Sequence, residues 1–276
     1  MRKTDLISGT RNGALALLYR IALVLALLLL AVGLNASVDN QADDIMARAD
    51  DMNRAHFEKL QLTMQLLEEG NVRASRELVW YFVNEGNIRS SLLKFTAPPS
   101  IQGDGVLIIE DNHQPNAVWN YLSATRSVRR IAGEHRQNRF MGTEMVFEDF
   151  EGLKRDLYEY RILRSDACPQ SGMCYVIEGQ ANNADERNTS SYSKKIFWIN
   201  RDNNVIVKID LYNKSGVLEK VCEMSGMRLI SGYWRPKRET MTNLLNGRAT
   251  VLLEEERKLN QPFDKYFISQ QYLRSE

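Results

Sequence analysis

The chain has 276 residues, 26% of them charged, with 36 basic and 35 acidic side chains and a net charge of +1. Residues 1–36 carry four of the basic and one of the acidic groups, so the rest of the chain has a net charge of −2. Non-specific nucleic-acid binding depends on basic residues that neutralise phosphates, so this balance argues against a nucleic-acid partner. The 240 residues after position 36 can bury a real core, and nothing in the sequence divides them into two domains.

Residues 1–36 are typical of a targeting segment. An uncharged apolar run over residues 21–34 follows four basic residues, which are Arg2, Lys3, Arg11 and Arg20. Fourteen helical residues span about 21 Å, less than the hydrocarbon core of about 30 Å. We therefore predict a signal peptide for export, cleaved before Leu34 or after Ala36, with an uncleaved inner-membrane anchor as the alternative.

The region from 40 to 54 is predicted to be helical, because Ile45, Ala49 and Met52 recur at helical spacing. After it, short segments rich in β-branched and aromatic residues alternate with turn residues, which predicts strands. The predicted strands are 60–68, 74–84, 87–96, 104–110, 117–122, 127–131, 157–164, 173–180, 192–200, 204–213, 217–230, 233–242 and 247–257.

Two segments interrupt this series. Residues 136–153 are predicted to form a loop with short helical turns, and residues 262–273 a terminal helix. So many consecutive strands with few helices predict a mainly β protein, in which one large curved antiparallel sheet forms an open barrel.

Three cysteines are present. Cys168 and Cys174 bracket the loop CPQSGMC and could form a disulfide in an oxidising compartment, while two reduced thiols on neighbouring strand ends are the alternative. The spacing is not that of a redox or zinc motif.

Sequence signatures of enzymes are missing. The chain has no G-x-S-x-G, H-E-x-x-H, Walker A or G-x-G-x-x-G motif, and its three histidines lie in unrelated segments. We predict the acids Glu144, Glu148 and Asp149 to be surface or helix-capping groups. The sequence thus predicts no enzymatic activity, no cofactor and no metal site.

An ordered set of motifs resembles the outer-membrane lipoprotein-sorting (LolA-like) proteins. These have a Trp-x-Tyr strand, a basic strand ending in Arg-Arg-Ile, then Phe-x-Gly-Ser/Thr-Asp/Glu and an acidic pair. The matching stretches here are WNY (119–121), RSVRRI (126–131), FMGTE (140–144) and ED (148–149). The late strand YWRPKRETMTN (233–243) agrees as well, so the resemblance covers residues 40–274. Thr143 and Glu144 depart from the commoner Ser-Asp pair.

The resemblance implies an incomplete β-barrel in residues 37–276, closed by helices, with a concave face that holds acyl chains. Its cargo would be an acylated lipoprotein or lipid, its place the periplasm and its partner an inner-membrane exporter or permease. The residues expected to line the cavity, with ordinary core packing as the alternative for each, are Trp80, Phe82, Leu107, Ile109, Trp119, Tyr121, Phe197, Ile199, Val207 and Ile209.

Three arginines remain to be placed. Arg126, Arg129 and Arg130 are expected to form a solvated strand face, or else to latch a helical lid or meet a lipid phosphate.

Two functions follow from the resemblance. The first is a periplasmic carrier that takes part in transfer of a lipoprotein or lipid from the inner to the outer membrane without chemistry. The alternative is an envelope accessory or stress-sensing domain on the same fold that binds a permease or another protein. Retention of the anchor would favour the alternative.

Overall fold

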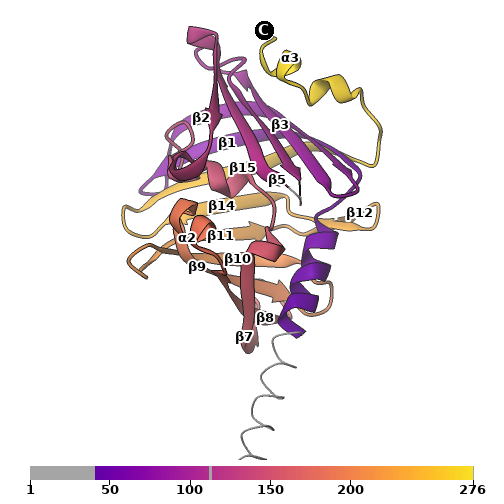
Figure 1. Ribbon diagram of the computed structural model, residues 1–276, viewed down its shortest axis with the longest axis vertical. Coiled ribbons are helices and arrows are strands. Elements are labelled where there is room, and N and C mark those ends of the chain that lie inside the picture. The colour runs from indigo at the N-terminus through magenta and orange to yellow at the C-terminus, as the bar shows by residue number, and fades with distance from the viewer. Residues whose placement is uncertain (1–40, 112–113, 276) are drawn as a thin grey trace, which may run out of the picture.

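The computed structural model describes residues 41–111 and 114–275 (Figure 1), so the predicted signal peptide or anchor at 1–36 lies outside the described residues. Most of the chain belongs to one antiparallel sheet of 13 strands in the order β6-β5-β4-β3-β2-β1-β15-β14-β11-β10-β9-β8-β7. The strands are β1 (Phe57–Glu68), β2 (Asn71–Glu85), β3 (Ile88–Ala97), β4 (Gly105–Asp111), β5 (Gln114–Leu122), β6 (Ser127–Ile131), β7 (Tyr158–Ala167), β8 (Met173–Ala181), β9 (Tyr192–Asn200), β10 (Ile206–Asn213), β11 (Leu218–Ser225), β12 (Arg228–Ile230), β13 (Tyr233–Arg235), β14 (Arg238–Asn243) and β15 (Arg248–Leu259).

The sheet is open, because its two edge strands, β6 and β7, stand at opposite ends of the strand order. The first strand, β1, lies in the middle of the sheet, and the chain runs from it by hairpins to the edge strand β6. Residues 132–157, which we call the crossover segment, then lead to the opposite edge strand β7. From β7 the chain returns strand by strand until β15 pairs with β1, Glu58 opposite Leu259. The predicted open-barrel sheet is confirmed.

Two predicted strands are each divided in the structure. Residues 217–230 form β11 and β12, and residues 233–242 form β13 and β14, with β12 and β13 paired in a separate small sheet. The chain turns at Gly226, whose φ is +66°, and at Pro236, which cannot donate to a strand ladder. The small hairpin therefore leaves the main sheet.

The helices are few and short. Residues 41–52 form the predicted first helix, which we call the N-terminal helix. The others are the 3-10 helices η1 (Ser123–Thr125), η2 (Gly133–Gln137), η3 (Phe147–Phe150), η4 (Arg155–Leu157) and η5 (Lys265–Phe267) and the α-helices α2 (Ala184–Thr189) and α3 (Gln270–Leu273). Helix α2 was not predicted from the sequence. Its one local signal is Asn183, which caps the helix by accepting a hydrogen bond from the backbone N–H of Glu186.

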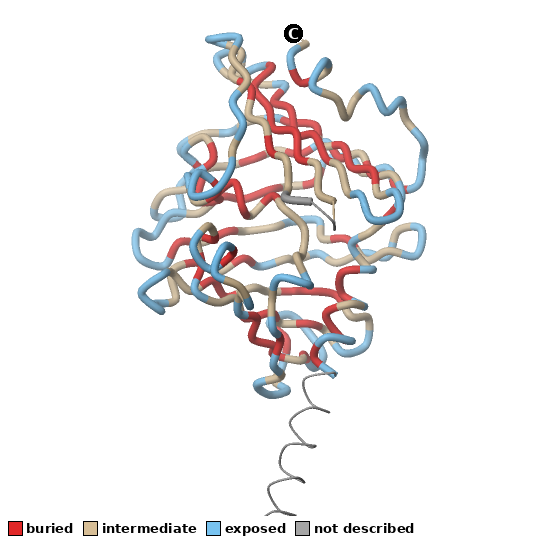
Figure 2. Tube along the Cα trace, viewed as in Figure 1, coloured by how far each residue is buried: buried red, intermediate tan, exposed pale blue. Residues whose placement is uncertain are grey.

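The two faces of the sheet are covered by different segments. On the concave face, the crossover segment packs its apolar residues into the main core with strands β1–β5 and β14–β15. The N-terminal helix (indigo in Figure 1) buries Ala42, Ile45, Met46 and Ala49 against strands β7–β10. On the outer face of β3–β5, the C-terminal segment (yellow in Figure 1) buries Leu273 in a separate apolar cluster. Buried residues accordingly concentrate in the strands, and exposed ones in the turns at the rim (Figure 2).

The C-terminal segment is fixed by one lysine. The ammonium group of Lys94 donates to the carbonyl of Tyr272 at 3.0 Å and also to the carbonyl of Ser275, and it lies 4.7 Å from the centre of the Tyr272 ring. Tyr81 stacks on Phe267 at 5.0 Å between ring centres. The outer face of β2–β4 is therefore closed by the chain itself.

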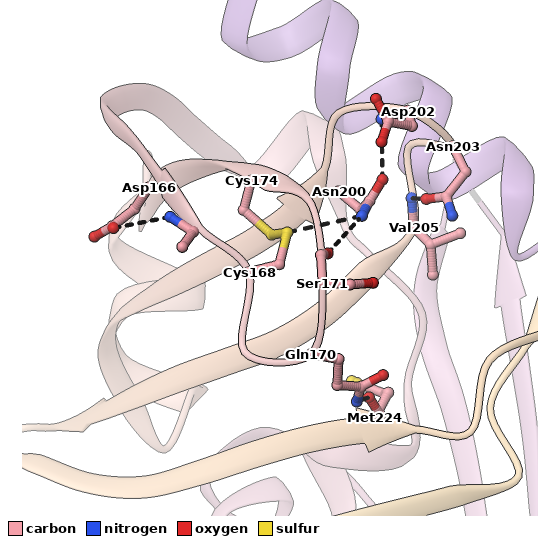
Figure 3. The surroundings of a disulfide bond; sticks show 11 residues. Asp166, Cys168, Gln170, Ser171, Cys174, Asn200, Asp202, Asn203, Val205 and Met224 are labelled. Carbon is pink, nitrogen blue, oxygen red and sulfur yellow. Dashed lines mark hydrogen bonds between the residues drawn. A yellow bond between two sulfur atoms is a disulfide. The ribbon is translucent and has the colours of Figure 1, made fainter.

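A disulfide joins Cys168 to Cys174 at the β7–β8 turn, with an S–S distance of 2.02 Å (Figure 3). The side-chain amide of Asn200 donates to the Ser171 carbonyl at 3.4 Å, and Gln170 donates to the carbonyl of Met224. These bonds tie the disulfide loop to strands β9 and β11.

Replacing both Cys168 and Cys174 with serine is expected to lower the free energy of unfolding by about 2 kcal/mol, because the disulfide closes a loop of seven residues in the unfolded chain. Urea denaturation of the two proteins measures the difference. Loss of the fold altogether would contradict a local effect.

Candidate functional site

A cavity of ≈ 290 Å³, here called the inner cavity, lies between the concave face of the sheet and the segments that cover it. Aromatic side chains from β2, β7 and β9 form much of its wall, and the crossover segment contributes Met145 and Phe150. The apolar residues that line it are Leu60, Trp80, Phe82, Met145, Phe150, Leu153, Tyr158, Tyr160, Phe197, Val205, Ile206, Ile209, Leu211, Met224, Met227, Trp234 and Met241.

A second cavity of ≈ 640 Å³, here called the vestibule, adjoins the first. It lies where the ends of β3–β6 meet the crossover segment and α2, and most of the residues that line it are polar or charged. The two cavities share the lining residues Asp50, Arg89, Arg136, Gly152, Leu153, Lys154 and Glu186. The shared residues 152–154 therefore lie between the two cavities, and charged side chains such as Glu148, Lys195 and Arg235 line the inner cavity beside its apolar residues.

Arg136 holds the crossover segment against α2. Its guanidinium donates to Glu151 at 2.8 Å, to Glu186 at 3.0 Å and to Thr189 at 2.9 Å, and the arginine is buried. Burial alone would lower the pKa of Arg136, but the two carboxylates raise it, so the group stays charged. Lys154 adds a further contact to Glu151 and Glu186.

Glu148 makes the second anchor of the crossover segment. Its carboxylate accepts hydrogen bonds from Lys195 at 2.8 Å, from the hydroxyl of Ser190 at 2.7 Å and from the backbone of Ser191 at 2.6 Å. Burial works to raise the pKa of Glu148, but Lys195 and the other donors outweigh it and lower the pKa to about 2. Glu148 is therefore ionised at every physiological pH.

Two of the acids predicted to lie at the surface are buried, which corrects that prediction. Glu144 is 3% exposed and Glu148 is 4% exposed. They are buried because the crossover segment lies on the concave face, where Asn243 donates to Glu144 at 2.9 Å and Arg139 pairs with it. Asp149 does cap η3, accepting from the backbone of Val146 at 2.8 Å, and it also accepts from the Tyr192 hydroxyl.

Two segments cover the inner cavity, the crossover segment and the N-terminal helix, and we call them the covers. Arg235 holds the second of them, the N-terminal helix, in place. Its guanidinium donates to the backbone carbonyl of Met52, the last residue of the N-terminal helix, at 2.7 Å, and to Glu58 at 3.0 Å. Arg257 also pairs with Glu58. Arg235 thus makes the contact with a covering helix that was expected of Arg126, Arg129 or Arg130.

Those three arginines lie elsewhere. Arg126, at the turn after η1, and Arg129 and Arg130, on the edge strand β6, are all exposed, and Arg130 lines the vestibule. The sequence signal for Arg235 was its place in the family-like stretch YWRPKRETMTN, but nothing in that stretch marks the arginine as buried.

The structure brings only some of the predicted cavity residues together. Trp80, Phe82, Phe197 and Ile209 line the inner cavity. Ile199 packs under the N-terminal helix, and Val207 packs beside the disulfide. The remaining four lie on the outer face in the cluster beneath the C-terminal segment, which is the core packing given as the alternative for each; they are Leu107, Ile109, Trp119 and Tyr121.

Within 41–111 and 114–275, no three side chains of His, Cys, Asp or Glu are grouped so that they could hold an ion. Over the same residues, no helix has the length and apolar character needed to cross a membrane.

A half-open antiparallel sheet wrapped around a covered cavity is a LolA-like open-barrel fold. The chain belongs to a family whose model, described as an uncharacterized protein, matches residues 88–275. No protein of curated function matches the sequence.

Solved structures share the fold. The chain is 22% identical to a DUF1329 family protein from Desulfovibrio piger, with a TM-score of 0.79 over 86% of this chain and 99% of that one. It is 19% identical to a domain named for outer membrane lipoprotein sorting from Vibrio parahaemolyticus, with a TM-score of 0.79 over 86% and 100%. A LolA superfamily protein from Nitrosomonas europaea is 21% identical, with a TM-score of 0.63 over 84% and 98%. At these identities the likeness establishes the fold.

Proposed function

We propose that this protein is a periplasmic carrier that binds the acyl chain of a lipoprotein or lipid in the inner cavity. It would accept its cargo from an inner-membrane exporter and pass it toward the outer membrane without chemistry. The observation that carries the proposal is a cavity with a largely apolar lining on the concave face of a LolA-like sheet, under two segments that are held by apolar packing and by polar contacts.

The lining of the inner cavity suits an acyl chain. Each buried methylene contributes about 0.8 kcal/mol, so a 16-carbon chain requires on the order of 12 kcal/mol of burial to leave a membrane for water. Inner cavity and vestibule, at ≈ 290 Å³ and ≈ 640 Å³, are of the size of ligand pockets, which run from about 300 to 1,000 Å³. Methionines in the wall, such as Met145 and Met241, adapt their shape to flexible ligands.

The covers suit release. Besides its apolar packing, the crossover segment is held by the Arg136 and Glu148 clusters, and the N-terminal helix is held by its contact with Arg235. Neither cover is paired as a strand of the 13-stranded sheet. A cover can therefore move while the sheet keeps its ladder of hydrogen bonds.

The disulfide supports the proposed compartment. Disulfides persist in the bacterial periplasm and other oxidising compartments and are rare in the cytosol. The Cys168–Cys174 bond therefore agrees with export by the apolar segment at residues 21–34.

Replacing Ile209 with asparagine is expected to weaken binding of a fluorescent fatty acid about tenfold or more. The amide would face the acyl chain in the inner cavity and lose about 1–3 kcal/mol through unpaired polar atoms. Titration of purified protein, followed by fluorescence, measures the dissociation constant.

Ile109 provides the matched control. It is also a half-buried strand isoleucine, but it packs on the outer face. Ile109→Asn should bind the fatty acid as the natural protein does, with circular dichroism used to check that both variants fold. Equal loss in both variants, or no saturable binding by the natural protein, would refute the proposal.

A further inference from the structure

Four side chains on the inner face of β11 and β14 form a sulfur-rich square in the wall of the inner cavity. Cys222 and Met224 lie two residues apart on β11, and Glu239 and Met241 lie two apart on β14. The antiparallel register sets Cys222 opposite Met241 and Met224 opposite Glu239. All four line the inner cavity.

The spacing within the square permits contact with one small ion. Directly opposite residues of an antiparallel pair have Cβ atoms about 4.5–5.5 Å apart, and the two methionines have three rotatable side-chain bonds each. Cys222 and Glu239 stand diagonally across the square and are already in contact, with the Sγ atom of Cys222 3.4 Å from Oε1 of Glu239. Three sulfur atoms and one carboxyl group can thus meet at one point.

Two groups of the square are poorly explained as core residues. Cys222 is a free thiol, and its contact with Glu239 is the one side-chain hydrogen bond found for either residue in the described part of the chain. An acid placed against a thiol in an apolar wall costs free energy that a pair of aliphatic side chains would not.

We propose that Cys222, Met224 and Met241 bind one soft monovalent metal ion of the Cu(I) and Ag(I) class. Thiolate and thioether donors select such ions over harder divalent metals. On binding, the sulfur of Cys222 exchanges its proton for the metal, and the proton passes to Glu239 or to water. This site uses thioethers, and it needs no histidine. It does not depend on whether the cavity also carries an acyl chain.

The test uses the full mature chain with its disulfide intact and Ag(I) as the probe, because silver needs no reductant. Native mass spectrometry should find one tightly held silver ion per chain, and competition with a thiol chelator should give its affinity. Cys222→Ser should abolish this binding. Met241→Leu, which keeps volume and apolar character, should weaken it about tenfold or more, as expected for a change at a metal site.

Met173 supplies the matched control, because it is a methionine that is 45% exposed at the start of β8 and does not line the inner cavity. Met173→Leu should leave the affinity unchanged. Lowering the pH should weaken binding, since protons compete for the Cys222 sulfur. The proposal is overturned if the natural protein holds no silver, if Cys222→Ser holds it as tightly, or if Met173→Leu and Met241→Leu weaken it equally.

Discussion

Replacing Phe140 with alanine is expected to lower the free energy of unfolding by about 3–5 kcal/mol, the cost of emptying a fully buried aromatic site. Phe140 has no exposed surface and lies where the crossover segment meets the sheet, within 4.7 Å of Phe150, 5.6 Å of Phe147 and 5.9 Å of Phe95 between ring centres. Urea denaturation followed by tryptophan fluorescence measures the loss.

Phe263 is the control for this substitution. It is a half-buried ring of the C-terminal segment, packed on the outer side against Phe57 and Tyr81. Phe263→Ala should cost clearly less than Phe140→Ala. If the two variants lose the same free energy, the crossover segment does not contribute the core that the structure gives it.

Replacing Glu148 with glutamine is expected to cost about 3–5 kcal/mol at pH 7, because it leaves the Lys195 ammonium group without its partner in a buried site. Chemical denaturation at pH 7 measures the cost. Glu68→Gln is the control, since Glu68 is 39% exposed and pairs with an exposed Arg248. A surface pair of this kind contributes about 1 kcal/mol or less.

The same glutamate predicts a pH dependence. The pKa of Glu148 is about 2 in the folded protein and about 4.3 in an unfolded chain, so its contribution of about 3 kcal/mol is present above pH 5. As the pH falls from about 4.5 to about 2, protonation removes that contribution. The natural protein should therefore lose more stability over this range than Glu148→Gln, and parallel curves for the two proteins would contradict the buried ion pair.

The strands could be predicted from the sequence because each one announces itself locally. The signals for a strand are local: apolar and polar residues alternate along it, as in residues 205–212, and turn residues flank it, as at 201–204 and 213–216. The structure agrees with nearly every predicted strand. It departs at β12 and β13, where a left-handed glycine and a proline divide two long apolar stretches.

The face of each strand could not be predicted in the same way. Strand β4 is apolar on both faces, so its pattern does not separate Val106, which packs in the concave core, from Leu107, which packs under the C-terminal segment. The difference is made by residues 260–275, which lie far away in the sequence. Periodicity tells which residues share a face, and only the tertiary fold tells what covers it.

The polar contacts that hold the crossover segment and the N-terminal helix could not be predicted from the sequence either. Arg136, Glu148 and Arg235 acquire their roles from partners at positions 186, 195 and 52, and no local pattern links such pairs. A buried charge is costly without its partner, so sequence reasoning places an unpaired acid at the surface. Glu148 was misplaced for that reason.

The most direct test asks where an acyl chain lies in the folded protein. A fatty acid that carries a photoreactive diazirine near its methyl end is bound, irradiated and located by peptide mass spectrometry. If the chain is carried in the inner cavity, the adducts should form on residues of its wall, which include Trp80, Phe82, Met145, Phe150, Phe197 and Ile209. Adducts confined to the outer cluster and its covering segment, that is to Leu107, Ile109, Trp119, Tyr121 and residues 263–273, would contradict it.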